Sequence, residues 1–134
     1  MDAAAKRLSL AFAAGALGAL ANGLAIWLAG DFGLTAAIGV SIAPQLTPAW
    51  LYPRICWGGL WGFMFALPIL DRSWVVRGLI FSLAPTIVQL FVVFPEKTAA
   101  GVMGLGLGAL TPLVVLAANA IWGLVAAGWY RLVR

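Results

Sequence analysis

The sequence predicts an all-α integral membrane protein, a bundle of four transmembrane helices. The first observation is composition: 64% of the 134 residues are hydrophobic and 9% are charged, against about 45–50% and about 25% in soluble domains. The second is that the apolar residues form four runs, each near the roughly 20 residues that a helix needs to cross a bilayer. The third is that these runs lack the alternating pattern of a membrane β-barrel, so helices are expected to satisfy the backbone.

The four runs have boundaries that the sequence marks. Lys6 and Arg7 precede the first run, which is too long for the apolar core of a signal peptide and is expected to be retained. Only residues 71–73 separate the second run from the third, which predicts a tight antiparallel hairpin. A single transmembrane domain, 1–134, is expected, with helices at 8–29, 53–70, 73–94 and 113–130.

The segment 33–53 is too apolar for a simple loop. Residues 33–43 are uncharged and mostly apolar, and Pro44, Pro48 and Pro53 then interrupt the chain. Eleven helical residues would reach about 16 Å, near half of the hydrocarbon core of about 30 Å. This segment is therefore expected to be either a re-entrant half-helix or an interfacial helix.

An internal repeat is predicted from matches spaced 63–65 residues apart. The tripeptide LTP at 46–48 recurs at 110–112, and the pair WG at 57–58 recurs at 122–123. Because each half would cross the membrane an even number of times, the halves are expected to be parallel repeats about an axis normal to the membrane. The expected halves are 1–70 and 71–134, with short hydrophobic inserts at 33–48 and 98–112.

The net charge of +4 indicates orientation rather than nucleic-acid binding, because the basic residues lie at the ends of apolar runs instead of forming a patch. With four crossings, only Arg54 and Lys97 fall on one side. The excess on the other side places both termini in the cytoplasm. The residues on that side are Lys6, Arg7, Arg72, Arg77, Arg131 and Arg134.

The inventory of reactive side chains argues against an enzyme. The chain has no histidine and a single cysteine, Cys56, so a histidine-assisted nucleophile or a histidine metal site is excluded. The acids are expected outside the spans, where no two form a paired site. No metal or cofactor is expected. The acids are Asp2, Asp31, Asp71 and Glu96.

Small residues recur at helix-packing spacing. Such stripes let helix backbones approach closely in a membrane, where the hydrophobic effect does not drive association. The stripes predict packing within the chain or, alternatively, a face for homo-oligomer formation. They comprise Gly15, Ala19 and Gly23 on the first helix, Gly58 and Gly62 on the second, Gly104 and Gly108 in the second insert, and Gly123 on the fourth helix.

Four polar residues in the runs are candidates for a shared polar cavity: Arg54, Asn22, Gln89 and Asn119. In the repeat Arg54 aligns with Asn119, and an arginine at membrane depth is a functional hypothesis by default. Two simpler interpretations stay open. The three amides can bridge helices, and Arg54 can extend to the outer interface with its charge in water.

The region from the third helix onward carries RGL at 77–79, QLFV at 89–92 and FP at 94–95, followed by LTP at 110–112. In these motifs it resembles the C-terminal part of YagU-type bacterial inner-membrane proteins, over less than half of the chain. The resemblance implies a small protein of the bacterial inner membrane and assigns no functional residue.

The absence of catalytic groups and of a buried acid, together with the packing stripes, predicts a structural or accessory membrane subunit. The alternative is a small pore or carrier for a neutral or anionic solute, with Arg54 and Asn119 near its path. The expected partners are the lipid bilayer and either further copies of the chain or a larger membrane complex. No nucleic-acid partner is expected.

Overall fold

The computed structural model describes residues 2–134, and every regular element within them is helical. The longest helix begins after Asp2, whose side chain accepts a hydrogen bond from the Ala5 amide at 2.8 Å and so satisfies a free amide of the first turn. The α-helices are α1 (Ala3–Asp31), α2 (Leu34–Ala37), α3 (Pro48–Gly62), α4 (Trp74–Val88), α5 (Phe94–Lys97) and α6 (Thr111–Val133). The other segments are the 3-10 helices η1 (Phe63–Ala66) and η3 (Val102–Leu107) and the π-helical turn η2 (Gln89–Val93).

Three helical stretches are long and apolar enough to cross a membrane, and they mark the chain as membrane-embedded. They are Ala3–Asp31, Trp74–Lys97 and Thr111–Val133. The middle stretch is continuous through α4, η2 and α5. These stretches correspond to the first, third and fourth runs of the sequence.

The second run differs from its predicted bounds at both ends. Its helix α3 begins five residues earlier, because the Thr47 hydroxyl caps the first turn and Pro48 occupies the first helical position. Helical structure ends at Ala66 because Pro68 disfavours the helical conformation of Leu67, which is extended at φ −73° and ψ 134°. The predicted link 71–73 is therefore a longer segment, 67–73.

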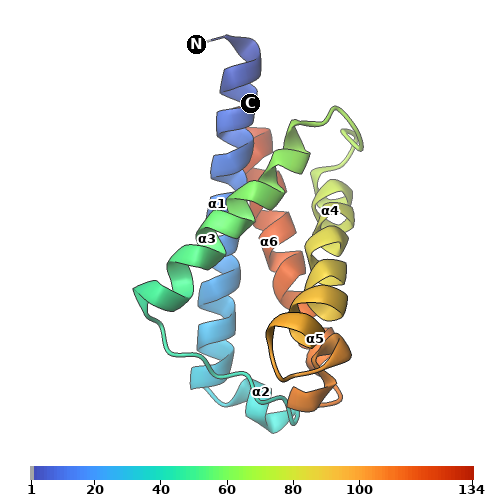
Figure 1. The fold of residues 1–134 in the computed structure, drawn as a ribbon. Coiled ribbons are helices and arrows are strands. Elements are labelled where there is room, and N and C mark those ends of the chain that lie inside the picture. The colour runs from blue at the N-terminus through green and yellow to red at the C-terminus, as the bar shows by residue number, and fades with distance from the viewer. Residues whose placement is uncertain (1) are drawn as a thin grey trace.

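The helices pack as a central pair with one partner on each side. α1 packs against α6, α3 crosses α1, and α4 packs against α6 (Figure 1). Both termini lie at one end of the bundle, and α2 and α5 lie at the other end. A pseudo-twofold relation between the two halves would repeat the contact of α1 with α6 as a contact of α4 with α3. The helices α3 and α4 share no comparable contact, so the expected relation does not extend to the contacts between the halves.

Glycines let α1 and α3 cross with their backbones in contact. A Cβ on Gly15 would overlap the Gly58 carbonyl, and a Cβ on Gly62 would lie 2.5 Å from the Ala11 carbonyl oxygen. The methyl group of Ala19 fills the space beside Gly58. These residues therefore act in packing within the chain, the first of the two uses expected from the sequence.

The same kind of contact joins α4 to α6. A Cβ on Gly78 would lie 2.5 Å from the Gly123 carbonyl oxygen, and a Cβ on Gly123 would overlap the Gly78 carbonyl. On α1, Gly23 makes room for the side chains of Leu51 and Trp50 from α3. A glycine pair of this kind therefore holds together the two long helices of each half.

The predicted GxxxG packing stripe in the second insert is wrong. Gly104 has φ +67° and Gly108 has φ +150°, so the two residues do not share a helix face. Their small size serves the turn instead. A Cβ on Gly104 would lie 2.7 Å from the Thr111 side chain, and one on Gly108 would overlap the Gly39 carbonyl of the other insert.

The first insert is not the eleven-residue helix that its apolar sequence allows. Only α2 is helical, because Gly39 takes a positive φ of 75° and the following residues 40–47 continue without a helix. The Ser41 amide donates a hydrogen bond to the Leu107 carbonyl at 2.9 Å. The two inserts therefore meet at the end of the bundle opposite the termini.

Candidate functional site

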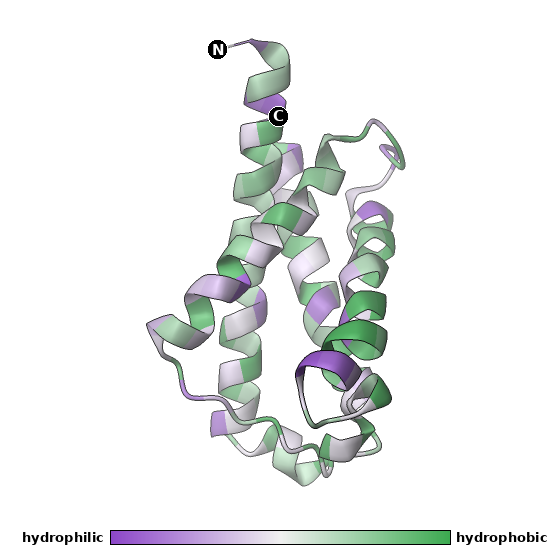
Figure 2. Ribbon diagram, viewed as in Figure 1, coloured by the Kyte–Doolittle hydropathy of each residue, from purple (hydrophilic) through white to green (hydrophobic). Residues whose placement is uncertain are grey.

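A chain of polar side chains links all four long helices. The Arg54 guanidinium on α3 donates to the Asn22 side-chain oxygen on α1 at 2.9 Å. Asn22 donates to Asn119 on α6 at 3.2 Å, and Asn119 donates to the Thr86 hydroxyl on α4 at 3.0 Å. Hydrophilic residues stand near one level on α1, α3 and α6 (Figure 2).

The early start of α3 determines the position of Arg54. Because α3 begins at Pro48, Arg54 lies about two turns inside the helix rather than at its first turn. Its guanidinium carbon lies 4.8 Å from the centroid of the Trp50 ring, and the side chain is directed toward Asn22. The half-buried Arg54 side chain is therefore directed into the bundle, toward α1.

A cavity of about 340 Å³ adjoins this polar chain; we call it the polar cavity. α1, α3 and α6 form its walls with the π-helical turn η2, and residues 41–44 of the first insert cover it. Gln89 lines it beside Arg54, Asn22 and Asn119, so all four polar candidates of the sequence border one space. Pro85 precedes the widened turn that carries Gln89, and such turns recur at functional sites.

Arg54 is incompletely satisfied by the described residues. Of its five N–H donors, one makes a hydrogen bond, and its buried Nε has no partner. Within residues 2–134 no carboxylate lies within 4.0 Å of it, and no acidic side chain lines the polar cavity. The polar cavity can therefore bind and orient an anion, but it offers no strong proton acceptor.

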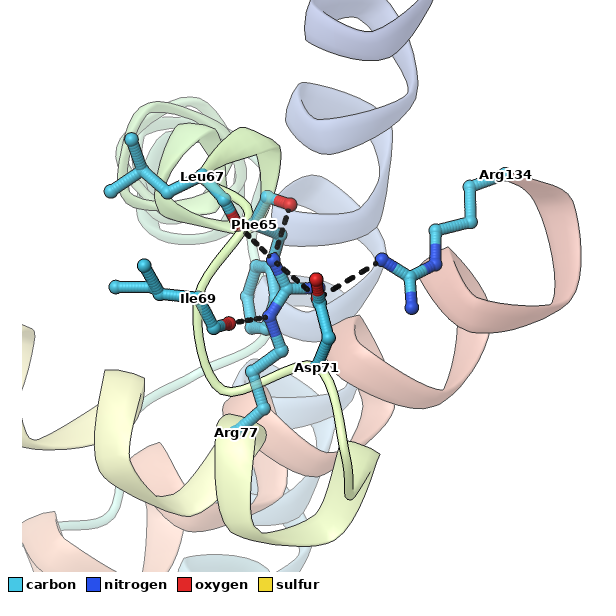
Figure 3. A network of polar contacts seen from close by, with 6 residues as sticks. All are labelled: Phe65, Leu67, Ile69, Asp71, Arg77 and Arg134. Atoms are coloured by element: carbon cyan, nitrogen blue, oxygen red, sulfur yellow. Dashed lines mark hydrogen bonds and ion pairs between the residues drawn. The ribbon is translucent and has the colours of Figure 1, made fainter.

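Arg77, unlike Arg54, has several hydrogen-bond partners. It is 3% exposed, and its guanidinium donates to the carbonyls of Phe65 at 2.8 Å, Ile69 at 3.1 Å and Leu67 (Figure 3). Asp71 lies 3.7 Å away and is shared with a second arginine at the C-terminus. Arg77 thus binds the backbone carbonyls that are left free where helical structure ends at Ala66.

Two residues of these networks are missing from the set expected from the sequence. Thr86 accepts the last side-chain bond of the polar chain while its own hydroxyl donates to the Ser82 carbonyl at 2.8 Å. Threonine often bonds to the preceding turn of its own helix in this way, so the sequence alone does not identify Thr86 as part of the polar chain. Arg77 carried a signal: it lies one turn inside the apolar run, whereas Arg72 precedes that run.

Comparisons of the chain with protein-family models, with curated proteins and with solved structures find no match.

Proposed function

We propose that this chain is a small membrane carrier that binds an anionic solute in the polar cavity beside Arg54. The observation that carries the proposal is a guanidinium that lines a cavity and has, among the described residues, one hydrogen bond and no carboxylate partner. A charge inside an apolar bundle is costly unless it is paired. A bound anion would neutralise Arg54 and accept its free N–H groups.

A packed core supports a carrier over an open pore. Phe65, Trp122 and Tyr130 are 1%, 3% and 2% exposed, and with neighbouring alanines they fill the bundle on the side of the polar cavity nearer the termini. Trp122 also donates from its indole nitrogen to the Gly15 carbonyl at 3.0 Å. Passage of a solute therefore requires that the helices move, as alternating access does.

The proposal includes four crossings, with α3 and η1 as the second. Together they cover residues 48–66, about 30 Å of helix. Their outward face carries Trp57, which is 64% exposed, with Leu60 and Phe63, and such an apolar face fits lipid. The distribution of basic residues then favours cytoplasmic termini. The resemblance noted above favours the bacterial inner membrane.

The proposal also includes descent from a duplicated helix pair. Gly15 contacts Gly58 where α1 meets α3, and Gly78 contacts Gly123 where α4 meets α6. These two contacts lie at matching positions of the sequence repeat. The tripeptide LTP stands at the start of α3 and again at the start of α6. These matches support homologous halves.

Anion flux into vesicles tests the carrier. Purified protein in phosphatidylcholine vesicles would be given radiolabelled acetate, chloride or phosphate in turn. Arg54→Gln is expected to reduce the flux of the transported anion at least tenfold, because hydrogen bonds to a charged group contribute about 1.5–3 kcal/mol. The matched control is Arg72→Gln, which removes an exposed arginine outside the polar cavity and should keep the wild-type flux.

Two results would overturn the carrier. One is a flux that Arg54→Gln leaves unchanged. The other is the absence of both flux and binding for all three anions and for a long-chain carboxylate. In that case an accessory role within a larger membrane complex becomes the better interpretation.

A further inference from the structure

A second cavity lies on the outer face of the bundle, where the end of α1 and the start of α6 flank α2. It measures about 550 Å³, within the range of small-molecule sites. Its lining is apolar except for Thr35, whose hydroxyl donates to the Ile42 carbonyl at 2.7 Å. We call it the apolar groove; the large side chains that line it are Leu28, Phe32, Leu34, Ile38, Leu113 and Ile121.

The apolar groove and the polar cavity share a wall. Ile26, Val114 and Ala118 line both. Nearer the termini α1 and α6 are in close contact, since a Cβ on Gly18 would lie 2.5 Å from the Trp122 carbonyl oxygen. Toward α2 the two helices diverge (Figure 1), and there one layer of side chains separates the two spaces.

The two sides of this wall differ in charge and polarity. Among residues 2–134, the polar cavity is lined by one cation, Arg54, beside amide side chains, whereas the apolar groove is lined by hydrocarbon except for Thr35. A solute with a charged end and an apolar chain fits both sides at once. Because Arg54 is the one basic residue that lines the polar cavity, the charge complement is a monoanion. A planar carboxylate also matches the fork of a guanidinium.

We propose that the anionic solute is a single-chain amphiphile, a long-chain carboxylate that enters from the lipid through the apolar groove. Its headgroup binds Arg54, and its chain lies between α1 and α6. The side chains of Ile26 and Val114 move aside to join the two spaces. This inference rests on the proposed function and adds the class of solute and its route.

Photolabelling in vesicles tests the inference. The probe is a long-chain fatty acid with a diazirine near the end of its chain, in phosphatidylcholine vesicles that hold the full chain. The acid is expected to label residues 25–38 and 113–121, at least fivefold more than its methyl ester does. Arg54→Gln should reduce labelling by the acid to the level of the ester.

A matched pair of tryptophan variants separates the apolar groove from the general lipid-facing surface. Ala117 lines the apolar groove and not the polar cavity, whereas Leu116 is exposed on the same helix and lines neither. Ala117→Trp should reduce labelling at least fivefold, and Leu116→Trp should leave it unchanged.

Two results would overturn the inference. One is equal labelling by the acid and the ester, which would describe an ordinary lipid contact. The other is a groove that yields no adduct in the wild-type protein, as when a second copy of the chain covers it. If either result is found while acetate flux still depends on Arg54, the carrier proposal holds and only the amphiphile inference is wrong. If neither Arg54-dependent labelling nor Arg54-dependent anion flux is found, the carrier proposal is wrong as well.

Discussion

Two arginines of the bundle have very different sets of partners. Arg77 meets three backbone carbonyls and an aspartate, and its guanidinium carbon lies 5.4 Å from the centroid of the Phe81 ring. Arg54 meets one amide oxygen and the ring of Trp50. The difference in partners predicts a difference in what each arginine contributes to stability.

Replacing Arg77 should destabilise the protein more than replacing Arg54. Arg77→Met leaves buried carbonyls without donors, and we expect the free energy of unfolding to fall by about 2–5 kcal/mol. Arg54→Met removes a half-buried charge with few partners and should change the same quantity by less than about 1 kcal/mol. Denaturant titration of both variants in one detergent makes the comparison. Equal losses would contradict distinct structural roles for the two arginines.

The bond between Asn22 and Asn119 should be measurable as a coupling. A double-mutant cycle with Asn22→Ala and Asn119→Ala is expected to give about 0.6–1.7 kcal/mol, the range found for side-chain hydrogen bonds between membrane helices. The control cycle pairs Asn22→Ala with Thr86→Ala, because these side chains share no direct bond. A control coupling as large as that of the bonded pair would contradict the order of the polar chain.

The polar side chains of the candidate site could be identified from the sequence because polarity stands out in apolar runs. Arg54, Asn22, Gln89 and Asn119 were candidates for a shared cavity, with simpler interpretations left open, and all four line one cavity. Their hydrogen-bond order could not be predicted. It depends on the tilt of α3 and on a helix start that follows from the Thr47 cap.

At the scale of elements, glycine pairs set the distance between helices, and this leads to a third prediction. Gly123→Ala places a methyl group against the Gly78 carbonyl and should cost about 1–3 kcal/mol of unfolding free energy. Gly128→Ala on the same helix meets nothing closer than 3.4 Å, so it should be neutral or stabilising by up to about 1 kcal/mol. Thermal unfolding of both variants measures the difference, and a Gly123→Ala protein as stable as wild type would contradict the backbone contact.

Hydropathy predicted the long helices well and the inserts poorly, for a physical reason. A spanning helix needs a long apolar run, and such runs are visible in the sequence. The inserts depend on positive φ angles at Gly39, Gly101, Gly104 and Gly108, and glycine allows such angles without requiring them. The spacing of Gly104 and Gly108 therefore resembles a helical stripe, although the two residues do not share a helix face.

At the scale of the whole molecule, the two ends of the bundle differ. The end with the termini is packed around Phe65, Trp122 and Tyr130 and is braced by the Arg77 network. The other end holds the polar cavity, the apolar groove and the two inserts. A carrier with this structure would hold its solute at the insert end, under residues 41–44, and would be closed by packing toward the termini. The number and the orientation of the crossings then decide which compartment the polar cavity faces.

Cysteine labelling counts the crossings. With Cys56→Ser as background, Gln45→Cys and Lys97→Cys place a thiol at the insert end, and Arg72→Cys and Arg131→Cys place one at the terminal end; all four positions are exposed. In bacterial spheroplasts an impermeant maleimide should label the first two, and label the last two only after lysis, because four crossings with cytoplasmic termini put the ends in different compartments. If Gln45→Cys and Arg72→Cys react from the same side, α3 does not cross the membrane. If all four positions react with reversed sidedness, the crossings stand and the polar cavity faces the cytoplasm.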